Sequence, residues 1–220
     1  MLRPTALVLL ALMAGGCHAK FKREAPTLGS VRTQVITTGG PVVQLGHVPM
    51  VGDDSPLGTL ANIAAVAVNI SQEIKAGDVA GRIGNAVRTE DVNHAFNDGV
   101  AQTLQGGPPF AYTDDPNAPA TLQVEVLSYG LSVPYLGAPG VFTYDLKVRI
   151  YKKDGDRVYK ASHACEIGAG TPGVTESVLG VVNNVKEIKE MSDEEINSAF
   201  ATMSAYCAQT FVIKMRKHAG

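Results

Sequence analysis

The stretch FTYDLKVRIYKKDGDRVYKASHACEI, residues 142–167, decides the fold. Its first half alternates between apolar and polar side chains, with the apolar set at Phe142, Tyr144, Leu146, Val148 and Ile150. This period of two is typical of a strand with one buried face. Asp154-Gly155 then supplies residues that tolerate the positive φ angles of a two-residue type I′ turn, so we expect an antiparallel hairpin. The expected cross-strand pairs are Lys153 with Asp156, Ile150 with Tyr159, Leu146 with His163, and Tyr144 with Cys165.

This register places Cys165 on the buried face of the hairpin, and a second pattern places Cys207 on a buried face as well. Near the C-terminus, apolar residues recur at spacings of three and four, as on one side of an amphipathic helix. They are Ile196, Phe200, Met203, Cys207, Phe211 and Met215. In an oxidising compartment the two cysteines would form a disulfide, and the alternative is a pair of buried free thiols.

Weaker patterns complete the expected fold. They predict strands at 31–38, 42–51 and 122–126, and helices at 60–74, 89–104, 176–190 and from residue 192 onward. Thr89 is the expected N-cap of the second helix, and Ser192 with Glu195 forms a capping box on the last one. The first helix is expected to weaken at Gly77, Gly81 and Gly84. This order predicts an α+β fold, an antiparallel sheet of about four strands with helices packed on one face. The other face of the sheet, with Thr143, Asp145, Lys147 and Arg149, is expected to meet water.

The N-terminus has the organisation of an export signal. Arg3 provides a basic start, residues 6–13 (ALVLLALM) an apolar run, and residues 14–16 (AGG) small side chains before Cys17. The apolar run is shorter than the roughly 20 residues that a membrane-spanning helix needs. The segment resembles the signal of bacterial lipobox lipoproteins, although Ala14 stands where Leu is most usual. An ordinary secretory signal with an incidental cysteine is the alternative.

The lipobox resemblance implies a signal peptide at 1–16 and acyl chains such as palmitate on Cys17, which would anchor the protein to a membrane. Residues 17–30 are charged and poor in apolar pattern, so we expect a lipidated tether there and a single domain over 31–220. His18 follows Cys17 where inner-membrane lipoproteins often carry Asp, which favours the outer membrane, facing the periplasm. Such a compartment is oxidising, so the sequence favours the Cys165–Cys207 disulfide.

Charge and hydropathy argue against nucleic-acid binding and against a second membrane-spanning segment. The chain has a net charge of −2, and loss of Arg3 with the signal peptide makes it −3, so nothing indicates nucleic-acid binding. Polar residues at Asn62, Asn69 and Gln72 interrupt the most apolar internal segment, 57–74, so no second membrane span is expected.

Several motifs resemble functional sites and have simpler explanations. The G-x-G-x-x-G spacing at 168–173 lacks the following parallel strand of a dinucleotide site, so we interpret it as a connector. His163 lies beside Cys165, but oxidation of Cys165 would leave no nucleophile. The cluster Asp114, Asp115 and Asn117 lacks the Gly and Glu of a calcium loop. Histidines His47, His94, His163 and His218 occur singly, without metal-ligand spacing.

The C-terminal cations have two interpretations. Lys214, Arg216, Lys217 and His218 could contact anionic lipid, and cations are also favoured in the last turn of a helix by the helix dipole.

The body resembles, by architecture alone, the small envelope lipoproteins that assist transport or assembly machines. This resemblance implies a non-enzymatic, lipid-anchored envelope protein that binds or scaffolds another envelope component, an unknown protein partner. We expect no catalytic, cofactor or metal-binding residues. The alternatives are a lipid-anchored carrier of a small apolar ligand and, with less support, an envelope hydrolase.

Overall fold

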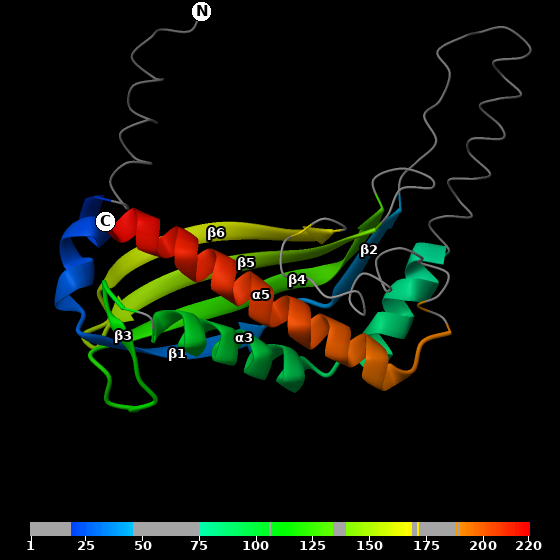
Figure 1. Ribbon diagram of the computed structural model, residues 1–220, viewed down its shortest axis with the longest axis horizontal. Helices are drawn as coiled ribbons and strands as arrows, with labels where there is room; N and C mark the ends of the chain where they lie inside the picture. Colours follow the sequence, from blue (N-terminus) through cyan, green and yellow to red (C-terminus); the bar gives the residue numbers. More distant parts are fainter. Residues whose placement is uncertain are drawn as a thin grey trace, which may run out of the picture.

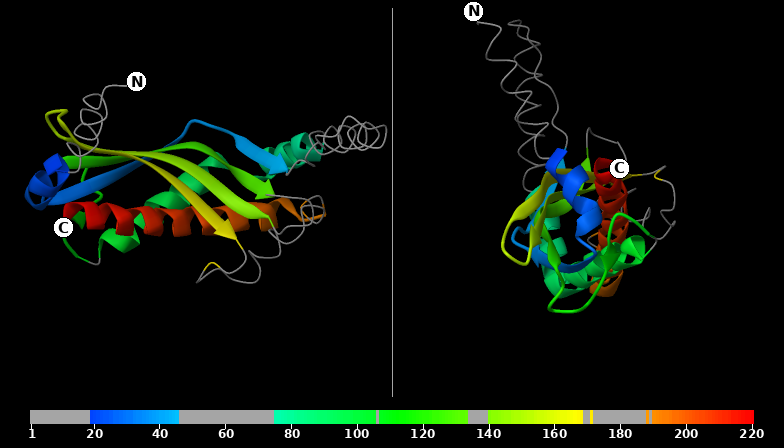
Figure 2. Two further views of the ribbon diagram at one scale, coloured as in Figure 1. Left: turned by 90° about the horizontal axis from the view of Figure 1, so that it is seen from above. Right: turned by 90° about the vertical axis from the view of Figure 1, so that its left-hand side faces the viewer.

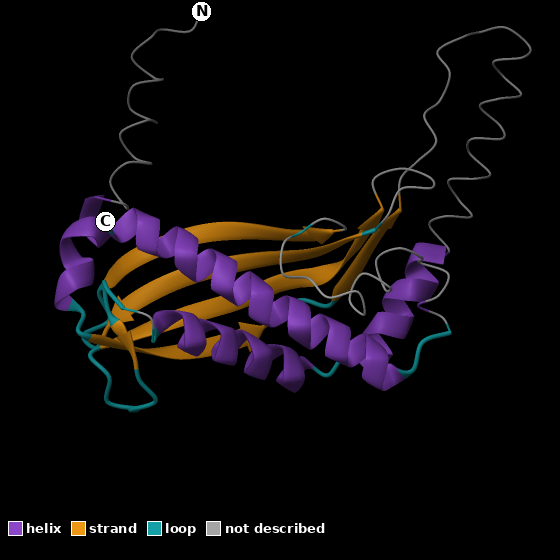
Figure 3. Cartoon of the chain, in the orientation of Figure 1, coloured by secondary structure: helices purple, strands orange, loops and turns teal. Residues whose placement is uncertain are grey.

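The protein is a two-layer α+β fold, with a curled sheet on one side and helices on the other (Figures 1 and 2). The computed structural model describes residues 19–45, 75–105, 107–133, 140–168, 171, 188 and 190–220. The strands are β1 (Ser30–Thr37), β2 (Pro41–Leu45), β3 (Ala111–Tyr112), β4 (Ala120–Val133), β5 (Val141–Lys152) and β6 (Arg157–Gly168). The helices are η1 (Ala25–Thr27), α3 (Thr89–Leu104) and α5 (Asp193–Ala219), and residues 19–24 and 75–86 are also helical (Figure 3).

The sheet is mixed, which corrects the expected antiparallel sheet of about four strands. Within the described residues, six strands form it in the order β3-β1-β4-β5-β6, with β2 also paired to β4. Strands β4, β5 and β6 form the expected antiparallel meander. However, β1 and β2 both run parallel to β4, and β3 runs parallel to β1. Alternation in the sequence identifies a strand and its buried face, but it does not identify the neighbour or the direction of pairing.

The hairpin has the predicted register and a different turn. Ile150 pairs with Tyr159, Leu146 with His163, and Tyr144 with Cys165. The predicted pairing of Lys153 with Asp156 is wrong, because the Lys152 amide donates to the Asp156 carbonyl at 2.9 Å instead. Gly155 has a φ of 86° and Asp154 does not have a positive φ, so the turn is not type I′. An irregularity in the ladder after Ile150 absorbs the shift of one position and restores the predicted register.

The core lies between the meander and the two long helices, and its faces match the periodicities in the sequence. The whole predicted stripe of α5 is at most 2% exposed, namely Ile196, Phe200, Met203, Cys207, Phe211 and Met215. The apolar face predicted for α3 is fully buried, namely Val92, Phe96, Val100 and Leu104. Gly99 allows α3 to approach α5, because a Cβ added there would lie 2.6 Å from the Ala205 carbonyl oxygen. The helix–helix contact therefore depends on the missing side chain.

On the face of β5 that points away from α3 and α5, the residues predicted to meet water are all at least partly exposed, with Asp145 exposed and Thr143, Lys147 and Arg149 intermediate. Asp145 is exposed there, and its carboxylate accepts a hydrogen bond from the Ser128 hydroxyl at 3.0 Å. On the same face the Arg149 guanidinium donates to Gln123 at 3.1 Å and to Glu125 at 2.9 Å. These cross-strand contacts are typical of a solvated sheet face.

The segment expected to be a tether is folded from residue 19 onward. Phe21 and Ala25 are 0% exposed and Leu28 is 3% exposed, and all three belong to the hydrophobic core. The Phe21 ring contacts the ring of Tyr159, with centroids 4.4 Å apart. Nothing in the sequence indicated that Phe21 is buried, because a single apolar side chain among charged residues leaves no periodic pattern. The tether prediction is therefore wrong for residues 19–30, because Ser30 already belongs to β1.

Local helix predictions differ from the structure in smaller ways. The Ser192–Glu195 capping box is present on α5, but α3 begins at Thr89 with Arg88 as its N-cap. Residues 75–86 are helical despite the glycines at 77, 81 and 84, because Val79 and Ile83 of this helix are buried in the core. The predicted helices at 60–74 and 176–190 lie outside the described residues, apart from 188 and 190.

Candidate functional site

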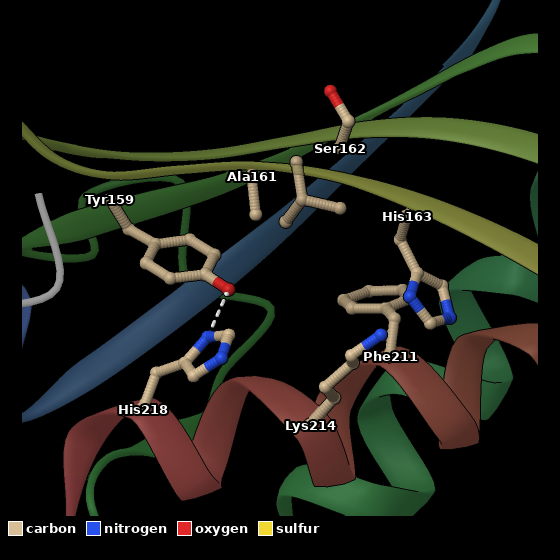
Figure 4. A pocket seen from close by; sticks show the side chains of 8 residues that line it. Tyr159, Ala161, Ser162, His163, Phe211, Lys214 and His218 are labelled. Carbon is tan, nitrogen blue, oxygen red and sulfur yellow. Dashed lines mark hydrogen bonds between the residues drawn. The ribbon is translucent and has the colours of Figure 1, made fainter. Parts of the chain in front are cut away.

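A small pocket lies between β6 and the C-terminal half of α5 (Figure 4). Its volume is about 40 Å³, enough for a few water molecules. The lining residues are Val148, Tyr159, Ala161, Ser162, His163, Phe211, Lys214 and His218. We call this the β6–α5 pocket. It contains two imidazoles, a phenol and an ammonium group, and two of these groups, Tyr159 and His163, have shifted pKa values.

Two local periodicities bring these side chains together. Tyr159 and His163 are at inward positions of β6, the last strand of the sheet, so their side chains lie at its margin. Phe211, Lys214 and His218 follow each other at helical spacings of three and four, and therefore lie on one side of α5. The pocket forms where these two margins meet.

Tyr159 and His218 form a linked pair across the pocket. The Tyr159 hydroxyl lies 3.0 Å from His218 Nδ1, within hydrogen-bond distance. Burial raises the pKa of Tyr159 to about 12, so the phenol stays protonated over the physiological range. The pair therefore ties the last turn of α5 to the start of β6.

His163 is a half-buried base of the pocket with a lowered pKa. Within the described residues, its Nε2 atom is buried and has no hydrogen-bond partner. The ring packs near Phe211, with centroids 6.5 Å apart. Burial, followed by repulsion from the Lys214 ammonium, lowers the pKa of His163. The folded state therefore favours the neutral imidazole.

The groups in the pocket do not form the Cys165–His163 nucleophilic pair that the sequence analysis considered. Cys165 is joined to Cys207 in a disulfide with a Cα–Cα distance of 5.9 Å, so it offers no thiolate to His163. Figure 4 shows Ser162 pointing away from His163, as the alternation of β6 requires. No acidic residue lines the pocket. Among the residues that the structure describes, no three His, Cys, Asp or Glu side chains are grouped as metal ligands would be.

We expect acidification to weaken the fold through His163. As the pH falls through about 6.5, the unfolded chain takes up a proton that the folded chain resists, so the free energy of unfolding decreases. Urea unfolding at about pH 7 and about pH 5 measures this effect, and His163→Gln should show a smaller loss than the wild type. Gln102→Ala, at an exposed position of α3, is the control because it removes no titrating side chain, and it should lose as much as the wild type. Equal losses in wild type and His163→Gln would contradict the assignment.

The pocket does not include the other candidate residues that the structure describes. Cys17 and His47 lie outside the described residues, as does most of the glycine-rich segment 168–173. The Asp115 carboxylate accepts a hydrogen bond from the backbone N–H of Asn117 at 2.8 Å, and Asp114 contacts the Tyr112 hydroxyl, as in an ordinary polar turn. Sequence reasoning missed the Tyr159–His218 pair. No local signal links the two residues, because they are 59 positions apart.

Comparisons with known proteins identify no family. No family model and no curated protein matches the chain. One similar solved structure is an uncharacterized protein at 12% identity and a TM-score of 0.36, covering 84% of this chain and 91% of that one. Another is the hypothetical protein CT253 from Chlamydia trachomatis, at 9% identity and a TM-score of 0.32, covering 81% and 97%. A third is lipoprotein GNA1162 from Neisseria meningitidis, at 16% identity and a TM-score of 0.25, covering 70% and 91%. Scores this low carry no argument about function.

Among the described residues, no helix is long and apolar enough to cross a membrane.

Proposed function

We propose that this chain is a lipid-anchored, non-enzymatic protein of the cell envelope that binds or scaffolds another envelope component. The observation that carries the proposal is the disulfide between Cys165 of β6 and Cys207 of α5. Structural disulfides persist in exported proteins and are rare in reducing compartments. The N-terminal pattern ending at Cys17 supplies the matching export signal, and acylation of Cys17 would supply the anchor. Because His18 and not Asp follows Cys17, similarity to lipoprotein sorting signals supports the outer membrane as the proposed location.

A binding role is favoured over a carrier role by how the fold is filled. A carrier of an apolar ligand needs a cavity of about 300 Å³ or more between the layers. Here fully buried side chains occupy that space, including Phe96, Phe142, Tyr144 and Phe200. The β6–α5 pocket, at about 40 Å³, is too small for such a ligand. These observations concern the described residues, and they favour an external surface as the functional part.

The anchor is tested on the native protein. We expect mass spectrometry to find an acylated Cys17 as the first residue of the mature chain, and Cys17→Ser to leave the protein unacylated. His18→Ser is the matched control, because it changes the adjacent residue and keeps the acceptor thiol. A native N-terminus elsewhere, without acyl chains, would contradict the anchor.

The binding role needs a separate measurement. Acylated wild type and the Cys17→Ser variant are each used to isolate interacting proteins from native envelopes, with quantitative mass spectrometry. We expect one envelope protein to be enriched with the acylated chain and to recover this chain in the reciprocal experiment. Turnover of an envelope substrate by the purified chain, with no enriched partner, would contradict a non-enzymatic role.

A further inference from the structure

The described fold begins at residue 19, close to Cys17 in the sequence, so a lipid anchor at Cys17 would restrict the orientation of the protein on its membrane. Cys17 precedes residue 19, the first described residue, by two positions. Consecutive residues span at most about 3.6 Å each, so the Cα atoms of these positions are within about 7 Å of each other. An anchor at Cys17 would therefore hold one end of the domain directly at the bilayer, without a flexible spacer.

Side-chain contacts show that residues 19–24 lie at the end of the domain that contains the β5–β6 turn and the C-terminus of α5. The helix over 19–24 is joined to the β5–β6 turn, because the Lys20 ammonium binds the Asp156 carboxylate at 2.8 Å. Phe21 packs on Tyr159, and its ring centroid is 6.4 Å from that of Phe110. Tyr159 is hydrogen-bonded to His218 of α5. Figures 1 and 2 agree that the start of this helix lies beside the C-terminus of α5.

Exposed basic residues gather at this same end. Lys22 and Arg23 follow the buried Phe21 and are exposed, with the Arg23 side chain 74% exposed. Arg157 is exposed at the start of β6, where its carbonyl oxygen accepts from Lys20 at 3.1 Å. Lys217 is exposed in the last turn of α5. We call these four residues, Lys22, Arg23, Arg157 and Lys217, the basic end.

Nearby acids offset only part of this charge. Asp156 is in an ion pair with Lys20, and Glu24 is in ion pairs with both Lys152 and Arg23, so the charge of Arg23 is partly offset while Lys22, Arg157 and Lys217 carry the excess. These cationic partners lower the pKa of both carboxyl groups. Asp154 adds an exposed carboxylate at the turn. The acidic loop between β3 and β4 lies at the side of this end opposite to the start of the helix (Figure 1). The basic end therefore keeps an excess of positive charge.

We propose that the basic end is a membrane-facing surface that binds anionic phospholipid headgroups of the leaflet holding the anchor. Lys22 and Arg23 are within about 6 Å of residue 19 along the helix axis, at 1.5 Å per residue. This is less than the Debye length of about 8 Å at physiological ionic strength, so their attraction to anionic lipid is not screened out. The orientation follows from the proposed lipid anchor, whereas the lipid affinity of the surface does not depend on it.

The lipid affinity is measured with residues 17–220, which contain every described residue, without acylation. Vesicles of phosphatidylcholine with phosphatidylglycerol should bind this chain, and phosphatidylcholine vesicles should not. Each Lys or Arg near an anionic surface contributes about 1 kcal/mol, so Lys22→Gln, Arg157→Gln and Lys217→Gln should each weaken partitioning about fivefold. Lys75→Gln is the matched control at an exposed site of the helix over 75–86, and it should bind as the wild type does. Urea unfolding of each variant shows whether Lys217 also stabilises the helix end.

The orientation is measured with the native acylated protein in anionic vesicles. Hydrogen exchange should slow at 19–24, 153–157 and 214–219 and stay unchanged at 128–132. Unchanged partitioning in the basic-end variants, an equal loss in Lys75→Gln, or slowed exchange at 128–132 alone would overturn the proposal. If Cys17 is not acylated but the unacylated chain binds anionic vesicles through the basic end, the lipid anchor fails and the lipid-binding surface stands.

Discussion

Replacing both Cys165 and Cys207 with Ala is expected to lower the free energy of unfolding by about 4 kcal/mol, because the disulfide closes a long loop. The two residues are 42 positions apart, and this length sets the chain entropy that the bridge removes from the unfolded state. The bridge also joins β6, at one edge of the sheet, to the middle of α5. A loss of this size is a large part of the roughly 5–15 kcal/mol that stabilises a typical domain.

Urea unfolding of the oxidised wild type, the reduced wild type and the double variant measures this contribution. All three are made in a Cys17→Ser background, in which "wild type" means that Cys165 and Cys207 are unchanged, so that only these two cysteines can supply thiols. Reduced wild type and the oxidised double variant should unfold at similar urea concentrations. Two reactive thiols in the oxidised, denatured wild type would show that the bridge is absent, and would restore Cys165 as a nucleophile beside His163.

Phe200→Ala is expected to destabilise the fold by about 3–5 kcal/mol, since it would open a cavity in the core. Phe200 is 0% exposed. Its ring centroid lies 5.0 Å from that of Phe142 and 5.7 Å from that of Tyr129. Its carbonyl oxygen also accepts hydrogen bonds from Tyr144 at 2.9 Å and Ser204 at 2.7 Å. The position therefore links α5 to β4 and β5.

Ile213→Ala is the matched control, because it removes a large apolar side chain from the same helix at a position that is 49% exposed. Surface substitutions of this kind change stability by less than about 0.5 kcal/mol. Chemical denaturation of both variants tests the difference. Equal effects at the two positions would show that α5 does not pack on the sheet through Phe200.

Prediction succeeded where a local period decides the structure. The hairpin register from Ile150–Tyr159 to Tyr144–Cys165 followed from alternation, because a slip of one residue would expose a whole apolar set. The α5 stripe and the Ser192–Glu195 capping box followed from spacings of three and four residues. These features also placed both cysteines inward.

The geometry of the β5–β6 turn could not be predicted from the local sequence. Asp154-Gly155 correctly located the reversal, but the type I′ geometry was wrong, because only Gly155 adopts a positive φ. A three-residue loop and an irregularity after Ile150 give the same register as the shorter turn. Different turns can therefore satisfy the same hydrophobic pattern.

The sequence by itself determined the hairpin register, the buried faces of α3 and α5, and the inward position of Cys165 and Cys207. Only the tertiary structure decided that β1 and β2 run parallel to β4, that residues 19–28 are folded, and that Tyr159 meets His218. The physical reason is that side-chain periodicity assigns each element a buried face, whereas strand direction and single contacts depend on segments far apart in the chain. Phe21 shows this difference, since one buried ring on Tyr159 places the start of the fold beside the end of α5.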